Sequence, residues 1–234
     1  MLHSMLRRRE IRQNLLLAAF WPVFGLCFYA LEWLVPGRQY HVMYHPIDDL
    51  IPFCELFLIP YLFWFVFMVG SYVYAFFADP RAFRRMMLFT IVTYGGGLVM
   101  FVLFPTCQNL RPVSFERDNF LTRTMAWFYT CDTSTNVCPS LHVCGSLAAA
   151  FGLTDTRRFS PPKRAAVVNA VALTICISTV FVKQHSIIDM IAGMALSAIA
   201  YRLVYCRKET RNAHETRRQL CHSDSERQET VSNL

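Results

Sequence analysis

The stretch Leu56–Ala78, LFLIPYLFWFVFMVGSYVYAFFA, contains no Asp, Glu, Lys or Arg. A helix needs about 20 mostly apolar residues to cross the hydrocarbon core of a membrane, and this stretch supplies them. Four more uncharged runs occur in the chain, at 13–31, 86–110, 133–154 and 165–182. The sequence therefore predicts an all-α integral membrane bundle.

The composition supports the same fold class. Of the 234 residues, 54% are hydrophobic and only 17% are charged, whereas soluble domains carry about 25% charged residues. A soluble globular protein, a secreted disulfide scaffold and a disordered chain are all excluded by this balance together with the five uncharged runs.

The hydrophobic pattern predicts six transmembrane helices in one membrane domain, residues 14–206. A basic N-terminus, residues 1–13, precedes this domain, and a polar tail, residues 207–234, is expected to be disordered. The first span is expected to be retained, because its apolar run is long for a signal peptide. The six expected spans are Asn14–Val35, Leu56–Phe77, Met86–Pro105, Pro139–Leu153, Ala165–Val182 and Ser186–Tyr205.

The positive charges predict the orientation of the bundle. With the N-terminus in the cytoplasm, 18 Lys and Arg residues fall on the cytoplasmic side and 5 on the opposite side. Cytoplasmic loops are enriched in these residues, so we expect both termini inside. The net charge of +7 is thereby explained by the basic residues that orient the helices in the membrane, and we expect no nucleic-acid partner. We favour a bacterial cell membrane over a eukaryotic endomembrane, and the oligomeric state is left open.

The nine cysteines contain no paired CxxC arrangement, so the sequence does not indicate a structural zinc site. Cys107, Cys131 and Cys138 fall on the expected outer side, where a disulfide could persist. The alternative is that all three are free thiols, and the sequence leaves both possibilities open.

Ionisable residues at membrane depth are candidates for function. His185 and Asp189 are spaced i, i+4 and share one helix face. The carboxylate can bind one imidazole nitrogen and leave the other as an electron-pair donor. The alternative is a helix-capping or packing pair.

A second histidine, His142, lies in the sequence Cys-Pro-Ser-Leu-His, residues 138–142. Pro139 suits the first position of a helix, so the amides of Ser140, Leu141 and His142 are expected at a helix N-terminus, which is an anion site. Two cations, Arg111 and Lys183, lie on the same expected side of the membrane. Together these residues favour a phosphoryl-transfer site.

Other polar features remain less defined. Pro52 and Pro60 flank Glu55, so the start of the second span is expected to be broken. Glu55 either lines the pocket of the site, pairs with a headgroup hydroxyl or packs against a neighbouring Ser or Tyr. Residues 120–129 are expected to form a short interfacial helix. Gly95–Gly97 is expected to allow close helix packing.

With these residues in place, the chain resembles the type 2 phosphatidic acid phosphatase superfamily, which includes lipid phosphate phosphatases and, more distantly, inositol phosphorylceramide synthases. The family motifs are Lys-x6-Arg-Pro, Pro-Ser-Gly-His and Ser-Arg-x5-His-x3-Asp. The chain carries the first as Arg111-Pro112, the second as residues 139–142 and the third as Ser178-Thr179, His185 and Asp189. The resemblance covers roughly residues 50–206.

Three positions depart from the motifs. Phe104 stands where the first motif has Lys, Leu141 replaces Gly as in inositol phosphorylceramide synthase-like members, and Thr179 replaces Arg. Lys183 is the candidate replacement for the lost positive charge. These departures affect the expected substrate class more than the expected reaction type.

The resemblance implies a metal-independent mechanism without a cofactor. His185 would attack phosphorus and form a phosphohistidine while Asp189 holds its ring, and His142 would act as general acid and then base. The phosphate would be bound by Arg111, Lys183, Ser140 and the amide of Leu141. Asp132 and Asn136 would brace the site or serve only as turn residues.

Three functions are thus open. The favoured one is a lipid phosphate phosphatase acting on the non-cytoplasmic face. The second is a lipid phosphotransferase of the inositol phosphorylceramide synthase type, which differs only in its acceptor. The third is a transporter or non-catalytic membrane protein, which the clustering of polar residues at span ends disfavours. A zinc site formed by His142, His185 and Asp189 is a lesser alternative.

Overall fold

The structure is a computed structural model that describes residues 2–33 and 39–206. The expected polar tail, residues 207–234, lies outside the described residues. The helices and short strands follow in the order α1 (Leu2–Ala18), α2 (Phe20–Trp33), β1 (His41–Val42), α3 (Ile47–Leu50), α4 (Leu58–Ala78), α5 (Pro80–Leu103), β2 (Thr106–Cys107), α6 (Phe120–Cys131), α7 (Leu141–Thr154), α8 (Pro162–Phe181) and α9 (Ile187–Tyr201). A 3₁₀ turn, Glu55–Phe57, precedes α4, and a π-helical turn, Arg202–Cys206, continues α9.

Five helical segments among the described residues are long and apolar enough to cross a membrane, as in a multi-pass membrane protein. They are Glu10–Trp33, Glu55–Ala78, Pro80–Leu103, Pro162–Phe181 and Ile187–Cys206. The sixth expected span corresponds to α7, which has only 14 residues. At 1.5 Å per residue α7 is about 21 Å long, which is shorter than the hydrocarbon core of about 30 Å. Five of the six expected spans are thus helices long enough to cross a membrane, whereas α7, the fourth expected span, is shorter.

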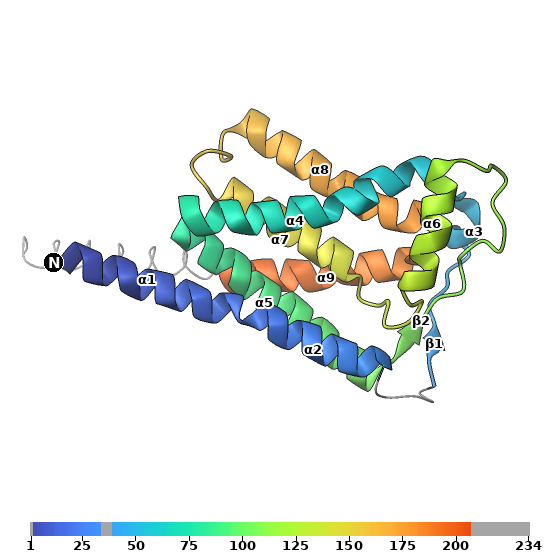
Figure 1. The fold of residues 1–234 in the computed structure, drawn as a ribbon, viewed down its shortest axis with the longest axis horizontal. Coiled ribbons are helices and arrows are strands. Elements are labelled where there is room, and N and C mark those ends of the chain that lie inside the picture. Colours follow the sequence, from blue (N-terminus) through green and yellow to red (C-terminus); the bar gives the residue numbers. More distant parts are fainter. Residues whose placement is uncertain (1, 34–38, 207–234) are drawn as a thin grey trace, which may run out of the picture.

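Helix α7 lies at the centre of the bundle and packs against α4, α5, α8 and α9 (Figure 1). Its small residues allow this close approach. A Cβ atom at Gly145 would lie 2.5 Å from the Tyr94 hydroxyl, and one at Gly152 would lie 2.5 Å from the Met86 sulfur. Because a short apolar helix surrounded by other helices needs little contact with lipid, its length is compatible with its place in the bundle.

Polar side chains cap the helices that lead into the site. Ser140 is the N-cap of α7, and Ser186 and Asp189 form a capping box at the start of α9. Such caps satisfy backbone N–H groups that the helix itself leaves unpaired. The expected break before α4 is confirmed, since the chain enters that helix through the 3₁₀ turn.

The connections at one end of the bundle carry the candidate site. The parallel strands β1 and β2, the helix α6 and the N-terminus of α9 lie at this end, whereas the α4–α5 and α7–α8 connections lie at the opposite end (Figure 1). The expected helix at 120–129 is present as α6, Phe120–Cys131. Large apolar side chains on the outer faces of the long helices are exposed, as a lipid environment requires; examples are Leu26, Val66, Val69, Val99, Val102, Leu173, Ile191 and Ile199.

Candidate active site

His185 and Asp189 form a buried pair at the start of α9. The Nδ1 atom of His185 lies 3.3 Å from Oδ2 of Asp189, and the same oxygen accepts a hydrogen bond from the Ser186 amide at 2.9 Å. His185 is 7% exposed and Asp189 is fully buried. Because Nδ1 is directed at the carboxylate, the electron pair of Nε2 is available on the other side of the ring.

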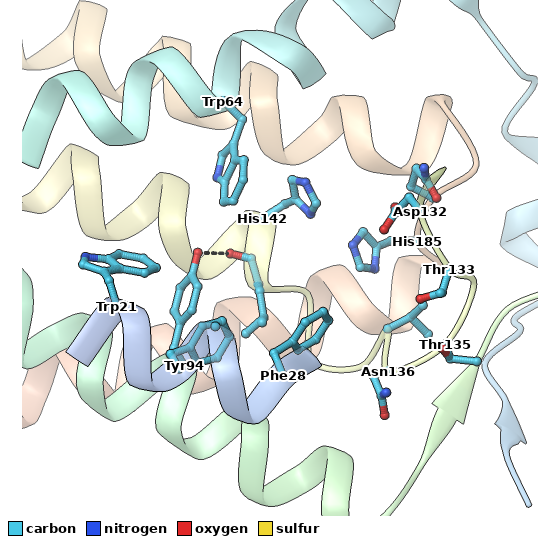
Figure 2. A pocket seen from close by; sticks show the side chains of 15 residues that line it. Trp21, Phe28, Trp64, Tyr94, Asp132, Thr133, Thr135, Asn136, His142 and His185 are labelled. Carbon is cyan, nitrogen blue, oxygen red and sulfur yellow. Dashed lines mark hydrogen bonds between the residues drawn. The ribbon is translucent and has the colours of Figure 1, made fainter. Parts of the chain in front are cut away.

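The ring of His142, in the first turn of α7, is held between aromatic side chains of α4. It stacks on Tyr61 with a centroid distance of 4.7 Å and lies tilted against Trp64 at 4.4 Å, and its centroid lies 5.6 Å from that of His185. Its Nε2 atom is buried and has no hydrogen-bond partner. Figure 2 shows the two imidazole rings at neighbouring positions on the same cavity. The structure therefore brings together the three residues that the sequence assigned to the chemistry.

Both histidines line a cavity of about 330 Å³. One wall is apolar and comes from α2, with Trp21, Phe24, Gly25 and Phe28. The opposite wall is polar, and its residues are Asp132, Thr133, Thr135, Asn136 and Gln184 (Figure 2). This division into an apolar and a polar wall is suited to an amphiphilic ligand.

Ser140 joins the two helices that carry the histidines. Its amide donates to the Asp189 carbonyl oxygen at 3.0 Å, and its hydroxyl accepts a hydrogen bond from the Val143 amide at 3.5 Å. Pro139 precedes this N-cap residue, which corrects the expectation that Pro139 is the first residue of the helix. Helix α7 begins at Leu141, two residues after Pro139. The backbone amide of Ser140 is already used in the hydrogen bond to Asp189 of α9 and is not a free donor for an anion.

Leu141 lines the cavity and closes the gap to α5. Its carbonyl oxygen accepts a hydrogen bond from the Tyr94 hydroxyl at 3.0 Å (Figure 2). A Cβ atom at Gly97 would lie 2.9 Å from the Leu141 side chain. The expected role of the glycine run in close packing is thus confirmed at Gly97.

The guanidinium of Arg111 contacts protein oxygens. It donates to the carbonyl oxygens of Asp132 and Thr133, both at 2.9 Å, and to that of Tyr129 at 3.1 Å. It also donates to Oε1 of Gln184 at 2.6 Å. Burial lowers the pKa of Arg111, and the nearby Asp132 carboxylate opposes this effect. Arg111 is not among the residues that line the cavity.

Lys183 is likewise committed to backbone carbonyls. Its Nζ donates to the carbonyl oxygen of Asp48 at 2.7 Å and to that of Ile51. Burial lowers the pKa of Lys183, and the acidic residues beside it oppose this effect. No Lys or Arg lines the histidine cavity in the described part of the chain, so neither expected phosphate-binding cation reaches it in this arrangement.

Asp132 and Asn136, expected as braces or turn residues, both line the cavity. Asn136 has a positive φ of 52°, and its backbone N–H donates to the Thr106 carbonyl oxygen at 2.6 Å. Glu55, in contrast, accepts hydrogen bonds from Asn119 at 3.2 Å and Arg117 at 3.4 Å. Glu55 does not line the histidine cavity.

Two carboxylates that the sequence did not single out hold the loops of the site. Glu32, near the end of α2, accepts hydrogen bonds from the hydroxyls of Thr133 and Thr135 at 2.6 and 2.7 Å and from the Asn136 side chain. Asp48 binds the start of α9. Their only signal in the sequence is a carboxylate beside an apolar span, which does not identify a partner.

The structure also bears on the disulfide and zinc-site alternatives. Cys107, Cys131 and Cys138 are all free thiols in the structure. Over the described residues, no group of three or more His, Cys, Asp or Glu side chains has an arrangement that could hold a metal ion. His142, His185 and Asp189 thus do not form the zinc site considered above.

Comparison with known proteins identifies one family. The family model described as the PAP2 superfamily matches residues 85–213, which is more than half of the chain. No curated protein and no solved structure matches. The matched segment contains both histidines and Asp189, whereas α2 and Asp48 lie outside it.

Proposed function

The chain belongs to the PAP2 superfamily, and on this premise we propose that it is a membrane-bound lipid phosphate phosphatase. Members of this superfamily are generally phosphatases, which supports an enzymatic activity on phosphate esters. The lipid substrate, the phosphohistidine intermediate and the choice of water as acceptor are our proposal. The His185–Asp189 pair, with the His142 ring beside it on a cavity that has an apolar and a polar wall, is the observation that carries it.

The proposed reaction begins with attack by Nε2 of His185 on the phosphorus atom. A bond between nitrogen and phosphorus forms while the bond from phosphorus to the alcohol oxygen breaks. His142 gives its proton to the departing oxygen, and Asp189 stabilises the positive charge that develops on the His185 ring. This step needs no metal ion and no cofactor.

The second step regenerates the enzyme. His142, now neutral, takes a proton from water, and the water oxygen attacks the phosphohistidine. The bond between nitrogen and phosphorus breaks, inorganic phosphate leaves, and His185 recovers its electron pair. The same residue therefore serves as acid and then as base.

The apolar wall supports a lipid substrate. Trp21, Phe24 and Phe28 of α2 extend the cavity away from the histidines. Their only hydrogen-bonding side-chain group is the indole N–H of Trp21. A hydrocarbon chain gains about 25 cal/mol per Å² on leaving water for such a surface. We therefore place the chain of the substrate against α2 and its phosphate at the histidines.

A phosphotransferase of the inositol phosphorylceramide synthase type is the second candidate. The hydroxyl oxygens of Thr133 and Thr135, whose protons go to Glu32, and Oδ1 of Asn136, which has no partner, favour it, because such oxygens accept hydrogen bonds from alcohol hydroxyls. In this reaction an alcohol replaces water in the second step. The non-cytoplasmic location of the site, which the charge distribution supports, remains part of the proposal. A bacterial cell membrane is also part of the proposal.

The test uses purified protein in detergent with phosphatidate, a diphosphate lipid and a phosphoinositide. Free phosphate and lipid products are measured together for the wild type, His185→Ala and a control, His41→Ala. His41 is an exposed histidine stacked on Phe104. We expect His185→Ala to lower turnover by a factor on the order of a thousand or more, and His41→Ala to leave it unchanged.

The products decide between the candidates. Free phosphate that depends on His185 identifies a phosphatase, and a new phospholipid without free phosphate identifies a transferase. Turnover in His185→Ala equal to that of the wild type would remove His185 as the nucleophile. It would also contradict the mechanism as a whole.

A further inference from the structure

The cavity lacks the positive charge that a phosphate site normally uses. Thr179 and Phe104 stand at two positions where the motifs have a cation. The Thr179 hydroxyl donates to the Cys176 carbonyl oxygen at 2.7 Å, and the Phe104 ring stacks on His41. Arg111 and Lys183 are bound to carbonyl oxygens. Another group must therefore donate to the phosphoryl oxygens.

Gln184 is a buried donor at the required place. It precedes His185 in the chain, lines the cavity and is 3% exposed. Its Nε2 atom is buried and has no hydrogen-bond partner. A buried amide N–H₂ without an acceptor is destabilising, and native proteins rarely leave one without a reason. A ligand oxygen in the cavity would supply the missing acceptor.

The orientation of this amide follows from its other contact. A guanidinium can only donate, so the Gln184 atom that Arg111 contacts at 2.6 Å must be the oxygen, Oε1. The nitrogen then occupies the remaining position of the amide. Arg111 thus acts on the cavity indirectly, because it fixes which end of Gln184 is free.

The backbone also fixes Gln184 relative to the nucleophile. The amides of Gln184 and His185 both donate to the Thr179 carbonyl oxygen, at 3.0 and 3.2 Å. The residue before them, Lys183, has a positive φ of 54°, which turns the chain tightly between α8 and α9. The side chain of Gln184 is therefore held beside His185 by two main-chain bonds and one guanidinium.

We propose that Nε2 of Gln184 donates a hydrogen bond to a non-bridging oxygen of the phosphoryl group attacked by His185. Gln184 would be a neutral replacement for the cations missing from the cavity. This inference rests on the proposed phosphoryl-transfer function. It assigns a substrate-binding role to a residue that the third motif leaves unspecified, the last of the five positions before His185.

The test compares Gln184→Met and Gln184→Glu with a matched control, Gln108→Met. Gln108 is also a buried glutamine, 1% exposed, whose Nε2 has no partner and whose Oε1 accepts from the Leu110 amide at 2.6 Å. Gln108 does not line the cavity. Turnover of phosphatidate and inhibition by orthovanadate, an oxyanion that mimics the transferring group, are measured for each protein in detergent.

The glutamate variant separates binding from support of the fold. In Gln184→Glu the new carboxylate would still accept from Arg111, but its second oxygen would face the phosphate without a proton to donate. We expect both Gln184 variants to weaken vanadate inhibition and kcat/KM by about 10- to 100-fold, with glutamate at least as harmful as methionine. Gln108→Met should match the wild type.

Two results would overturn the inference. If Gln184→Glu retains wild-type inhibition and turnover, then Gln184 serves only to hold Arg111. If both Gln184 variants match Gln108→Met, then Nε2 does not contact the phosphoryl group. Failure of the proposed function is recognised separately, because the wild type would then show no more turnover or vanadate binding than His185→Ala.

Discussion

The Asp48 carboxylate accepts a hydrogen bond from the Ser186 hydroxyl at 2.6 Å. Its other oxygen accepts the Ile187 amide at 2.8 Å, and Asp48 is only 2% exposed. A negative charge at the N-terminus of a helix is stabilised by the unpaired N–H groups there. Asp48 therefore fixes the start of α9 directly after His185, from a segment that lies outside the family match.

Asp48→Ala is expected to lower both stability and turnover. The substitution leaves the Ser186 hydroxyl and the Ile187 amide without their buried partner, which costs about 2 kcal/mol or more. Because His185 directly precedes Ser186, whose hydroxyl Asp48 binds, we expect kcat to fall by about tenfold or more while KM changes little. Thermal unfolding in detergent and phosphatidate turnover measure the two effects.

The matched control for Asp48 is Asp49→Ala. Asp49 is the next residue and accepts a hydrogen bond from the exposed Tyr44 hydroxyl. It should change neither kcat nor the unfolding temperature appreciably. Equal effects at both positions would show that Asp48 does not position His185.

The sequence predicted those parts of the site that depend on local spacing. His185 and Asp189 were expected on one helix face; they are in contact, but His185 precedes the N-cap Ser186, so Asp189 reaches back to it from the first turn of α9. Long uncharged runs likewise predicted the long helices, because the hydrocarbon core sets their length. Helix α7 was the exception, since a buried central helix can be shorter than a span.

Contacts between distant residues could not be predicted in this way. Arg111 was expected to bind phosphate, yet its partners include Asp132, Thr133 and Gln184, which only the folded chain brings to it. Lys183 was likewise expected to bind phosphate, yet it donates to the carbonyl oxygen of Asp48, which is far from it in the sequence. A motif gives the residue type, whereas the competition between a ligand and nearby carbonyl oxygens is decided by the tertiary structure.

Glu32 is expected to hold the polar wall of the cavity in place. In Glu32→Ala the side chains of Thr133, Thr135 and Asn136 lose their shared acceptor. Hydrogen bonds to a charged group contribute about 1.5–3 kcal/mol each. We therefore expect amide hydrogen exchange in residues 133–138 to accelerate by about 10- to 100-fold, and turnover to fall.

The comparison for Glu32 is Glu10→Ala, at an exposed position on α1. Exchange in 133–138 should be unchanged in that variant, and exchange in α9 should be unchanged in both. Uniform acceleration of exchange over the whole chain in Glu32→Ala would indicate general destabilisation. It would contradict the proposal that Glu32 specifically holds the polar wall.

Cys138 is expected to resist thiol reagents. Burial and the nearby Asp189 carboxylate raise the pKa of Cys138 to about 12, and only the thiolate reacts. At pH 8 maleimide should therefore label the exposed Cys131 and leave Cys138 largely unmodified. Labelling of Cys138 should rise as the pH approaches 12.

Neutralising Asp189 tests the cause of this resistance. In Asp189→Asn a negative charge beside the thiol is removed, so the pKa of Cys138 should fall and its labelling at pH 8 should accelerate. Peptide mapping without reductant follows the modification and also detects any disulfide among Cys107, Cys131 and Cys138. A disulfide, or rapid labelling of Cys138 in the wild type, would contradict the structure at this point.

Gly25 is expected to determine which substrate chains the cavity accepts. It lies on the apolar wall, and a Cβ atom there would meet no other atom within 4 Å. Gly25→Leu should therefore fold normally while its side chain occupies the space assigned to the lipid chain. The ratio of kcat/KM for long-chain to short-chain phosphatidate should fall by about tenfold or more. Gly70→Leu is the control, because Gly70 on α4 is equally unhindered but does not line the cavity. An unchanged ratio in Gly25→Leu would place the chain elsewhere, even if both substrates are hydrolysed.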